Sequence, residues 1–111
     1  MQNNLTCFPE NQILNIRDAL SALPKAHREK LMAGYDLKSL ENVFDDDGIM
    51  STVEAFLKNG MNISLTARSL YMHRNTLIYK LNAIKKLTGF DLRNFDMAVT
   101  FKILHTLYVL K

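Results

Sequence analysis

The sequence predicts an all-α fold, a compact helical domain. Apolar residues recur at helical spacing along the chain, and no segment shows the alternation of a strand. Short stretches of Gly, Pro, Asn or Asp separate the apolar segments. With 111 residues, 48% hydrophobic and 23% charged, the chain can form one core without a metal or disulfide. Its single cysteine, Cys7, excludes an intramolecular disulfide framework.

The first half of the chain predicts four helices, separated by short turns. They are expected at residues 13–23, 25–33, 37–44 and 49–57. Pro24 closes the first helix, and Gly34 ends the second as a left-handed residue. The run of three aspartates at 45–47 is expected to cap the fourth helix. A calcium loop is disfavoured because the run lacks a suitably spaced closing glutamate.

A tight pair of helices follows. The first is short, runs to Tyr71, and is capped by Asn62 or Ser64. After a turn at residues 72–73, the second runs over 74–88 and stops at Gly89.

The last helix is expected from an N-cap at Asn94 to about Leu110. Eleven of its sixteen residues, 95–110, are apolar, and they surround the helix rather than forming one stripe. The domain core can cover one side. We expect a second subunit, or a sensor region absent from this chain, to cover the rest.

The charge of the chain is unevenly distributed. The net charge is +3, but residues 61–93 contain six basic residues and one acid. Residues 10–60 contain six basic and nine acidic residues. This asymmetry favours a polyanionic partner for the middle segment, although a solvated basic face would have a similar composition.

The helix predicted at 74–88 has one apolar and one polar face. The inward face is expected to carry Leu77, Leu81, Ile84 and Thr88. The opposite face carries Asn75, Tyr79, Asn82 and Lys86. A solvated face is more often filled with Glu and Lys pairs, whereas this helix contains no acid.

Amides, hydroxyls and cations of this kind are the groups that contact DNA. Asn pairs bidentately with adenine and Arg with guanine, and lysines meet phosphates. Together with the short helix before it, this surface predicts a DNA-binding helix-turn-helix. The candidate base contacts are Arg74, Asn75, Thr76 and Tyr79. The candidate phosphate contacts are Ser64, Arg68, His73 and Lys80. A zinc-ligand role for His73 is disfavoured because no other ligand lies at suitable spacing.

Residues 66–81 resemble the C-terminal helix-turn-helix of the purine-catabolism and sugar-diacid regulators, the PucR/CdaR family. The shared features are an alanine-containing helix and the run His-Arg-Asn-Thr-Leu at 73–77, followed by a tyrosine and a basic residue before leucine. The Leu-Thr-Gly run at 87–89 resembles the continuation in that family, although Ile78 stands where a basic residue is common. A looser similarity exists to the DNA-binding end of the factor for inversion stimulation.

The resemblance implies two parts, an N-terminal helical segment at 1–47 and a helix-turn-helix domain at 48–111. It also implies that a larger N-terminal sensor region belongs with such a domain, so that this chain is a C-terminal piece or a free-standing DNA binder.

The function expected from the sequence is sequence-specific binding of double-stranded DNA in transcriptional regulation, by a homodimer. No cofactor, metal, catalytic group, secretory signal or membrane span is expected, and the bacterial cytoplasm or nucleoid is the expected location. Two alternatives remain. One is a helical dimerisation or adaptor module that binds an acidic protein. The other is a nucleoid-type architectural factor that bends many DNA sites.

Overall fold

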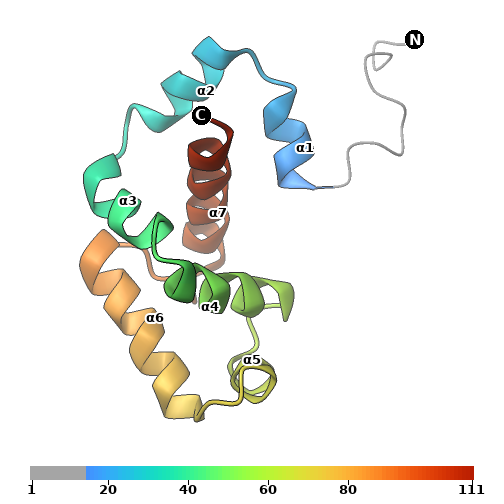
Figure 1. Ribbon diagram of the computed structural model, residues 1–111, viewed down its shortest axis with the longest axis vertical. Helices are drawn as coiled ribbons and strands as arrows, with labels where there is room; N and C mark the ends of the chain where they lie inside the picture. The colour runs from blue at the N-terminus through green and yellow to red at the C-terminus, as the bar shows by residue number, and fades with distance from the viewer. Residues whose placement is uncertain (1–14) are drawn as a thin grey trace. The chain divides into compact units, whose positions relative to one another are not determined.

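The computed structural model describes residues 15–111, and within them it contains helices and no strand (Figure 1). The all-α prediction is therefore confirmed. The start of the first predicted helix, at 13–14, and Cys7 lie outside the described residues. The helices are α1 (Ile16–Ser21), α2 (Lys25–Met32), α3 (Leu37–Phe44), α4 (Asp47–Lys58), α5 (Ile63–Ser69), α6 (Arg74–Thr88) and α7 (Phe95–Leu110).

The described helices belong to two compact units. Helices α1 and α2 share one unit with residues 102–111, which include the second half of α7. The other unit comprises residues 36–101, with α3 to α6 and the first turns of α7. Each unit buries apolar side chains. In the first these are Leu20, Met32, Leu104 and Leu107. In the second they include Leu40, Val43, Phe56, Leu77, Leu81 and Phe101.

Asparagine and aspartate side chains cap four of the helices. Asn15 caps α1, and Asp46 caps α4 by accepting from the backbone N–H of Ile49 at 3.0 Å. The predicted capping role of the aspartate run is thereby confirmed. Asn94 caps α7. For α5 the cap is Asn62, whose oxygen accepts from the N–H of Leu65 at 2.8 Å. Each cap satisfies an N–H group that the helix itself leaves unpaired.

Three helices end at a residue with a left-handed backbone, but the left-handed end predicted for α2 is not found. Gly89 ends α6 with φ 83°, as the sequence predicts, and Gly60 follows α4 with φ 68°. The prediction for Gly34 was wrong. Helix α2 ends at Met32 with Ala33 in a right-handed conformation, and Gly34 is not among the residues with positive φ. The third left-handed stop, at the end of α5, is Tyr71 with φ 54°.

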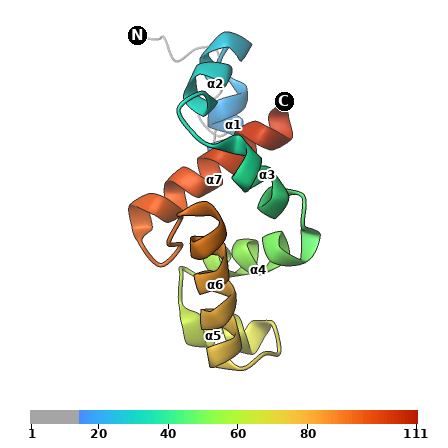
Figure 2. The same ribbon diagram turned by 90° about the vertical axis from the view of Figure 1, so that its left-hand side faces the viewer.

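Helices α3 to α6 pack against one another around the buried side of α6. Helix α5 packs on α6 and α4, while α3 packs on α4 and α6 (Figure 2). Ala67 of α5 is buried, as expected if α5 and α6 cross closely. Phe101 at the middle of α7 contacts the rings of Phe44 and Phe90 edge-on, with centroids 5.2 and 5.8 Å away. These contacts pack α3, α7 and the segment after α6 against one another.

Candidate nucleic-acid interface

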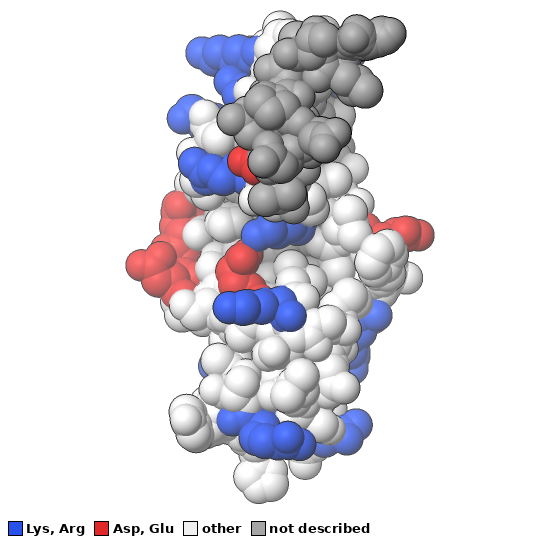
Figure 3. Space-filling model, turned by 90° about the vertical axis from the view of Figure 1, so that its right-hand side faces the viewer, with Lys and Arg blue, Asp and Glu red and all other residues white. Residues whose placement is uncertain are grey.

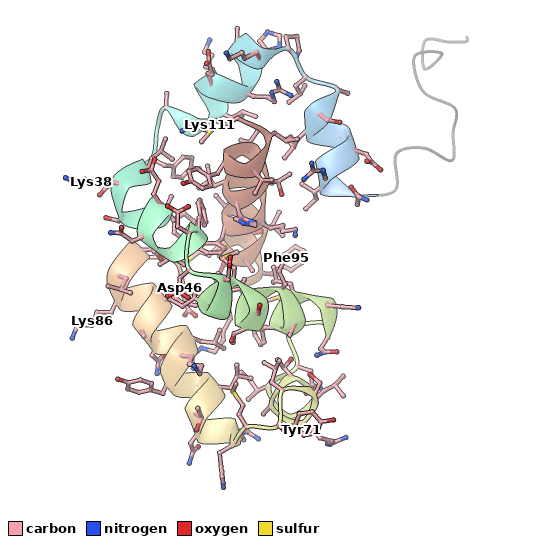
Figure 4. The ribbon with its side chains drawn as sticks, viewed as in Figure 1. Lys38, Asp46, Tyr71, Lys86, Phe95 and Lys111 are labelled. Atoms are coloured by element: carbon pink, nitrogen blue, oxygen red, sulfur yellow. The ribbon has the colours of Figure 1, made fainter. Side chains whose placement is uncertain are left out.

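Helix α6 presents its apolar side to the core and its polar side outward. Leu77, Leu81 and Ile84 are buried, which confirms the inward face predicted for them. Asn75, Tyr79, Asn82 and Lys86 are exposed, as predicted for the opposite face. Figure 4 shows the Lys86 side chain pointing away from the helix. The periodicity of the sequence therefore placed these side chains correctly.

All eight candidate contact residues are exposed. Their exposed side chains lie on α5, on the turn after it and on the first half of α6. They are Ser64, Arg68, His73, Arg74, Asn75, Thr76, Tyr79 and Lys80. Because none of them is buried, each can reach a partner without opening the core.

Four of the eight gather around one shallow depression at the α5–α6 turn. It is lined by Ser64, Arg68, His73 and Arg74, together with three residues not predicted as contacts. The Nη1 of Arg74 donates to the hydroxyl oxygen of Ser64 at 3.3 Å. This hydrogen bond links the start of α6 to α5 and restricts the guanidinium of Arg74. Ser64 therefore lies inside α5 and beside Arg74, whereas the helix cap is Asn62.

Tyr79 and Lys80 lie elsewhere, about one and a half turns further along α6. They line a narrow apolar hollow between α4 and α6, with Ile49, Leu87 and neighbouring residues. The Tyr79 side chain remains 74% exposed. The structure thus does not gather all eight residues in one hollow. Four lie at the α5–α6 turn, Tyr79 and Lys80 line the second hollow, and Asn75 and Thr76 line neither.

The helix pair is electrostatically one-sided. No acidic residue lies between Asn62 and Phe90, a stretch that includes five Lys or Arg side chains. On the face shown in Figure 3, the end of the molecule formed by α5 and the start of α6 carries blue side chains and no red ones. A surface of this composition attracts phosphate oxygens, and it carries no negative charge that would repel a polyanion.

A further cation lies beside the outer face of α6, and sequence reasoning missed it. Arg93, in the segment after α6, donates from Nη2 to the side-chain oxygen of Asn82 at 2.7 Å. Asp91 contacts both Arg93 and Lys85. It accepts from the backbone N–H of Arg93 at 3.0 Å and lies 3.8 Å from the Nζ of Lys85. No helical periodicity could reveal this contact, because Arg93 reaches α6 from an irregular segment.

The carboxyl of Asp91 is tuned by the same contacts. The backbone N–H of Arg93, followed by the charge of its guanidinium, holds the pKa of Asp91 below its usual value. These contacts with Arg93 therefore favour the charged form of the carboxyl.

Neither a metal-binding cluster nor a membrane-spanning helix is found in the described part of the chain. Among residues 15–111 no group of three His, Cys, Asp or Glu side chains is placed to hold a metal ion. No helix of that part is both long and apolar enough to cross a membrane.

A short helix, a four-residue turn and a second helix with an exposed polar face define a helix-turn-helix domain. This class was expected from the sequence. Comparison with known families identifies it further. Residues 49–105, half of the chain, match the PucR C-terminal helix-turn-helix domain. The chain belongs to this family.

Three of the curated relatives are bacterial regulators by name. The carbohydrate diacid regulator of Escherichia coli is 43% identical over 53 residues, which are 47% of this chain and 14% of the regulator. The purine catabolism regulatory protein of Bacillus subtilis is 30% identical over 95 residues, 83% of this chain and 18% of that protein. The DNA-binding transcriptional activator AdeR of B. subtilis is 29% identical over 90 residues, 78% of this chain and 21% of AdeR. The chain therefore spans about a fifth or less of each.

Proposed function

We propose that this chain binds double-stranded DNA in a sequence-specific way, as the DNA-binding part of a transcriptional regulator. The observation that carries the proposal is the outer face of α6. It is exposed, contains no acid, and carries amide, hydroxyl and cationic groups on a helix braced by α5. In a helix-turn-helix the second helix enters the major groove, and its first residues meet the base edges.

The positions of the side chains divide the proposed contacts into two groups. Arg74, Asn75 and Thr76 occupy the first turn of α6 and are proposed to contact bases, with Tyr79 one turn later. Ser64, Arg68, His73 and Lys80 flank them and are proposed to contact phosphates. The hydrogen bond between Arg74 and Ser64 supports this division, since it joins a proposed base contact to the helix that crosses the backbone.

We further propose that the chain acts as a homodimer and belongs with a sensor region of a longer regulator. Helix α7 has exposed apolar side chains, among them Phe95 and Val109, which supports a partner that covers them. The regulators matched above are several times longer than this chain, which supports the second part. A DNA-binding role would place the protein in the bacterial cytoplasm or nucleoid.

The test is selection of bound duplexes from a random-sequence pool, followed by titration of the full chain. A selected duplex and a scrambled duplex of equal length are titrated at two salt concentrations. We expect the selected duplex to bind at least about tenfold more tightly, the effect of one mismatched base pair or more. We also expect affinity for both to fall steeply with salt.

Two results would overturn the proposal in different ways. Equal affinity for the selected and scrambled duplexes would indicate an architectural, non-specific binder. Absence of DNA binding, together with salt-sensitive binding of an acidic protein, would indicate an adaptor module.

A further inference from the structure

Tyr71 occupies an unusual position in the turn between α5 and α6 (Figure 4). Its side chain is 97% exposed, more than any other large hydrophobic side chain of the described residues. Its backbone is left-handed, with φ 54°. A large side chain gains little from packing when it is this exposed, and non-glycine residues rarely adopt this conformation. Neither packing nor backbone preference therefore explains a tyrosine here.

The end of α4 provides the comparison. After α5, the N–H of Met72 donates to the carbonyl of Ala67 at 2.9 Å, and the N–H of Tyr71 donates to that of Arg68 at 3.2 Å. The same pair of hydrogen bonds ends α4, where Gly60 occupies the position of Tyr71 and is followed by a second left-handed residue, Met61 with φ 63°. This is the Schellman motif, in which glycine is the usual left-handed residue. The chain thus uses glycine for this geometry at α4 and tyrosine at the helix-turn-helix.

The surroundings of Tyr71 are cationic. It lines the shallow depression with His73 and with the cations Arg68 and Arg74, and no acidic residue lies within nine positions on either side of it. A phenol hydroxyl at the rim of such a depression can donate to a phosphate oxygen that the neighbouring cations attract. The ring below it offers a flat apolar surface.

We propose that Tyr71 contacts the sugar–phosphate backbone at the edge of the major groove. Its hydroxyl donates to a phosphate oxygen, and its ring packs on an adjacent deoxyribose. This inference rests on the proposed function, because the first helix of a helix-turn-helix crosses the backbone while the second enters the groove, so the turn between them lies at the groove edge.

A contact of this kind has a distinctive signature. Phosphate and sugar contacts carry no base information, so removing one weakens all sequences alike. Tyrosine is uncharged near neutral pH and displaces no counterion, so its loss leaves the slope of affinity against salt unchanged. Removal of a lysine on a phosphate lowers that slope. A base contact changes the ratio between sequences. The effect of replacing Tyr71 is therefore distinguishable from the effect of removing a lysine–phosphate contact and from that of removing a base contact.

The experiment compares the parent chain with Tyr71→Phe and Tyr71→Gly, on a selected duplex and a random-sequence duplex at three salt concentrations. Tyr35→Phe is the control for removal of a phenol hydroxyl in the other compact unit, and Lys80→Ala is the control for removal of a cation. Glycine suits the left-handed conformation, so Tyr71→Gly is expected to fold, which thermal unfolding checks.

We expect Tyr71→Phe to weaken binding about threefold to tenfold, which is within the usual range for the loss of one hydrogen bond. We expect Tyr71→Gly to weaken it by about tenfold or more, equally on both duplexes and with the parent salt slope. Parent-like binding by Tyr71→Gly would overturn the inference while leaving the proposed function intact. So would a loss confined to the selected duplex. A parent chain that binds neither duplex would overturn the proposed function and this inference together.

Discussion

At the scale of single residues, Thr66 is the one buried threonine of α5 and differs from the other two buried threonines. Thr52 donates its hydroxyl to the carbonyl of Gly48 at 3.2 Å, and Thr106 donates to that of Lys102 at 2.7 Å. The hydroxyl oxygen of Thr66 is buried without a hydrogen-bond partner among the described residues. A buried hydroxyl in this state opposes folding by about 1–3 kcal/mol.

Thr66→Val is therefore expected to stabilise the fold. Valine has nearly the same shape, so the hydroxyl is removed without leaving a cavity, and the free energy of unfolding should rise by about 1 kcal/mol. Urea denaturation measures the change as a higher midpoint with an unaltered slope. Thr52→Val serves as the matched control and should bring no such gain. A drop in stability of the Thr66 variant would show that its hydroxyl has a partner in solution.

At the scale of elements, the helix pair depends on the close approach of α5 to α6. Ala67 is buried where α5 packs against its neighbours, and a larger side chain there must displace one of them. The geometry of this crossing sets where α5 lies when the outer face of α6 meets DNA. A change at Ala67 should therefore affect both stability and binding.

We expect Ala67→Leu to destabilise the fold by about 1–3 kcal/mol, the usual effect of overpacking a core. DNA affinity should fall as well, because α5 would no longer hold Arg74 through Ser64. Ala26→Leu, on the exposed side of α2, is the matched control and should change stability by less than about 0.5 kcal/mol. For both variants, urea denaturation measures stability and duplex titration measures DNA affinity. An Ala67 variant as stable as the parent would contradict a close crossing.

The ends of α6 and α2 show which features the sequence patterns predict and which they do not. Helix α6 was predicted with both of its ends, because its apolar period is regular and Gly89 provides the left-handed stop. The same reasoning predicted a left-handed Gly34 at the end of α2, and that prediction was wrong. Glycine permits a left-handed conformation without requiring it, and α2 ends without one.

Two contributors to the site could not be found by these patterns. The left-handed conformation of Tyr71 depends on hydrogen bonds that close the end of α5, and local preference argues against it. The contact of Arg93 with Asn82 joins residues eleven positions apart through an irregular segment. Helical periodicity places side chains on a face of one helix, but it does not place a loop against that face. The exposure of the eight predicted contacts, in contrast, followed from periodicity and turn position.

At the scale of the whole molecule, the proposed dimer has a direct consequence in solution. Phe95, at the start of α7, is 68% exposed, and Val109, near its end, is 50% exposed. Exposed apolar side chains on one helix favour association when a partner can cover them.

Sedimentation of the full chain is expected to show a concentration-dependent dimer. Replacing Phe95 with Ser should shift the equilibrium toward the monomer, whereas Leu31→Ser, an exposed apolar change on α2, should not. A dimer would also bind duplexes whose half-sites lie about one helical turn apart, or a multiple of it. A strict monomer at high protein concentration would contradict the proposed dimer.

The central claim is that the outer face of α6 meets base edges, and Asn75→Ala tests it most directly. Duplex titration compares the selected sequence with all its single-base variants, using Lys80→Ala as the control for a phosphate contact. We expect Asn75→Ala to lose about 1–3 kcal/mol of binding and to relax the preference at one base pair. Lys80→Ala should weaken all duplexes alike and reduce the salt slope. Parent-like binding and specificity in both variants would contradict the account.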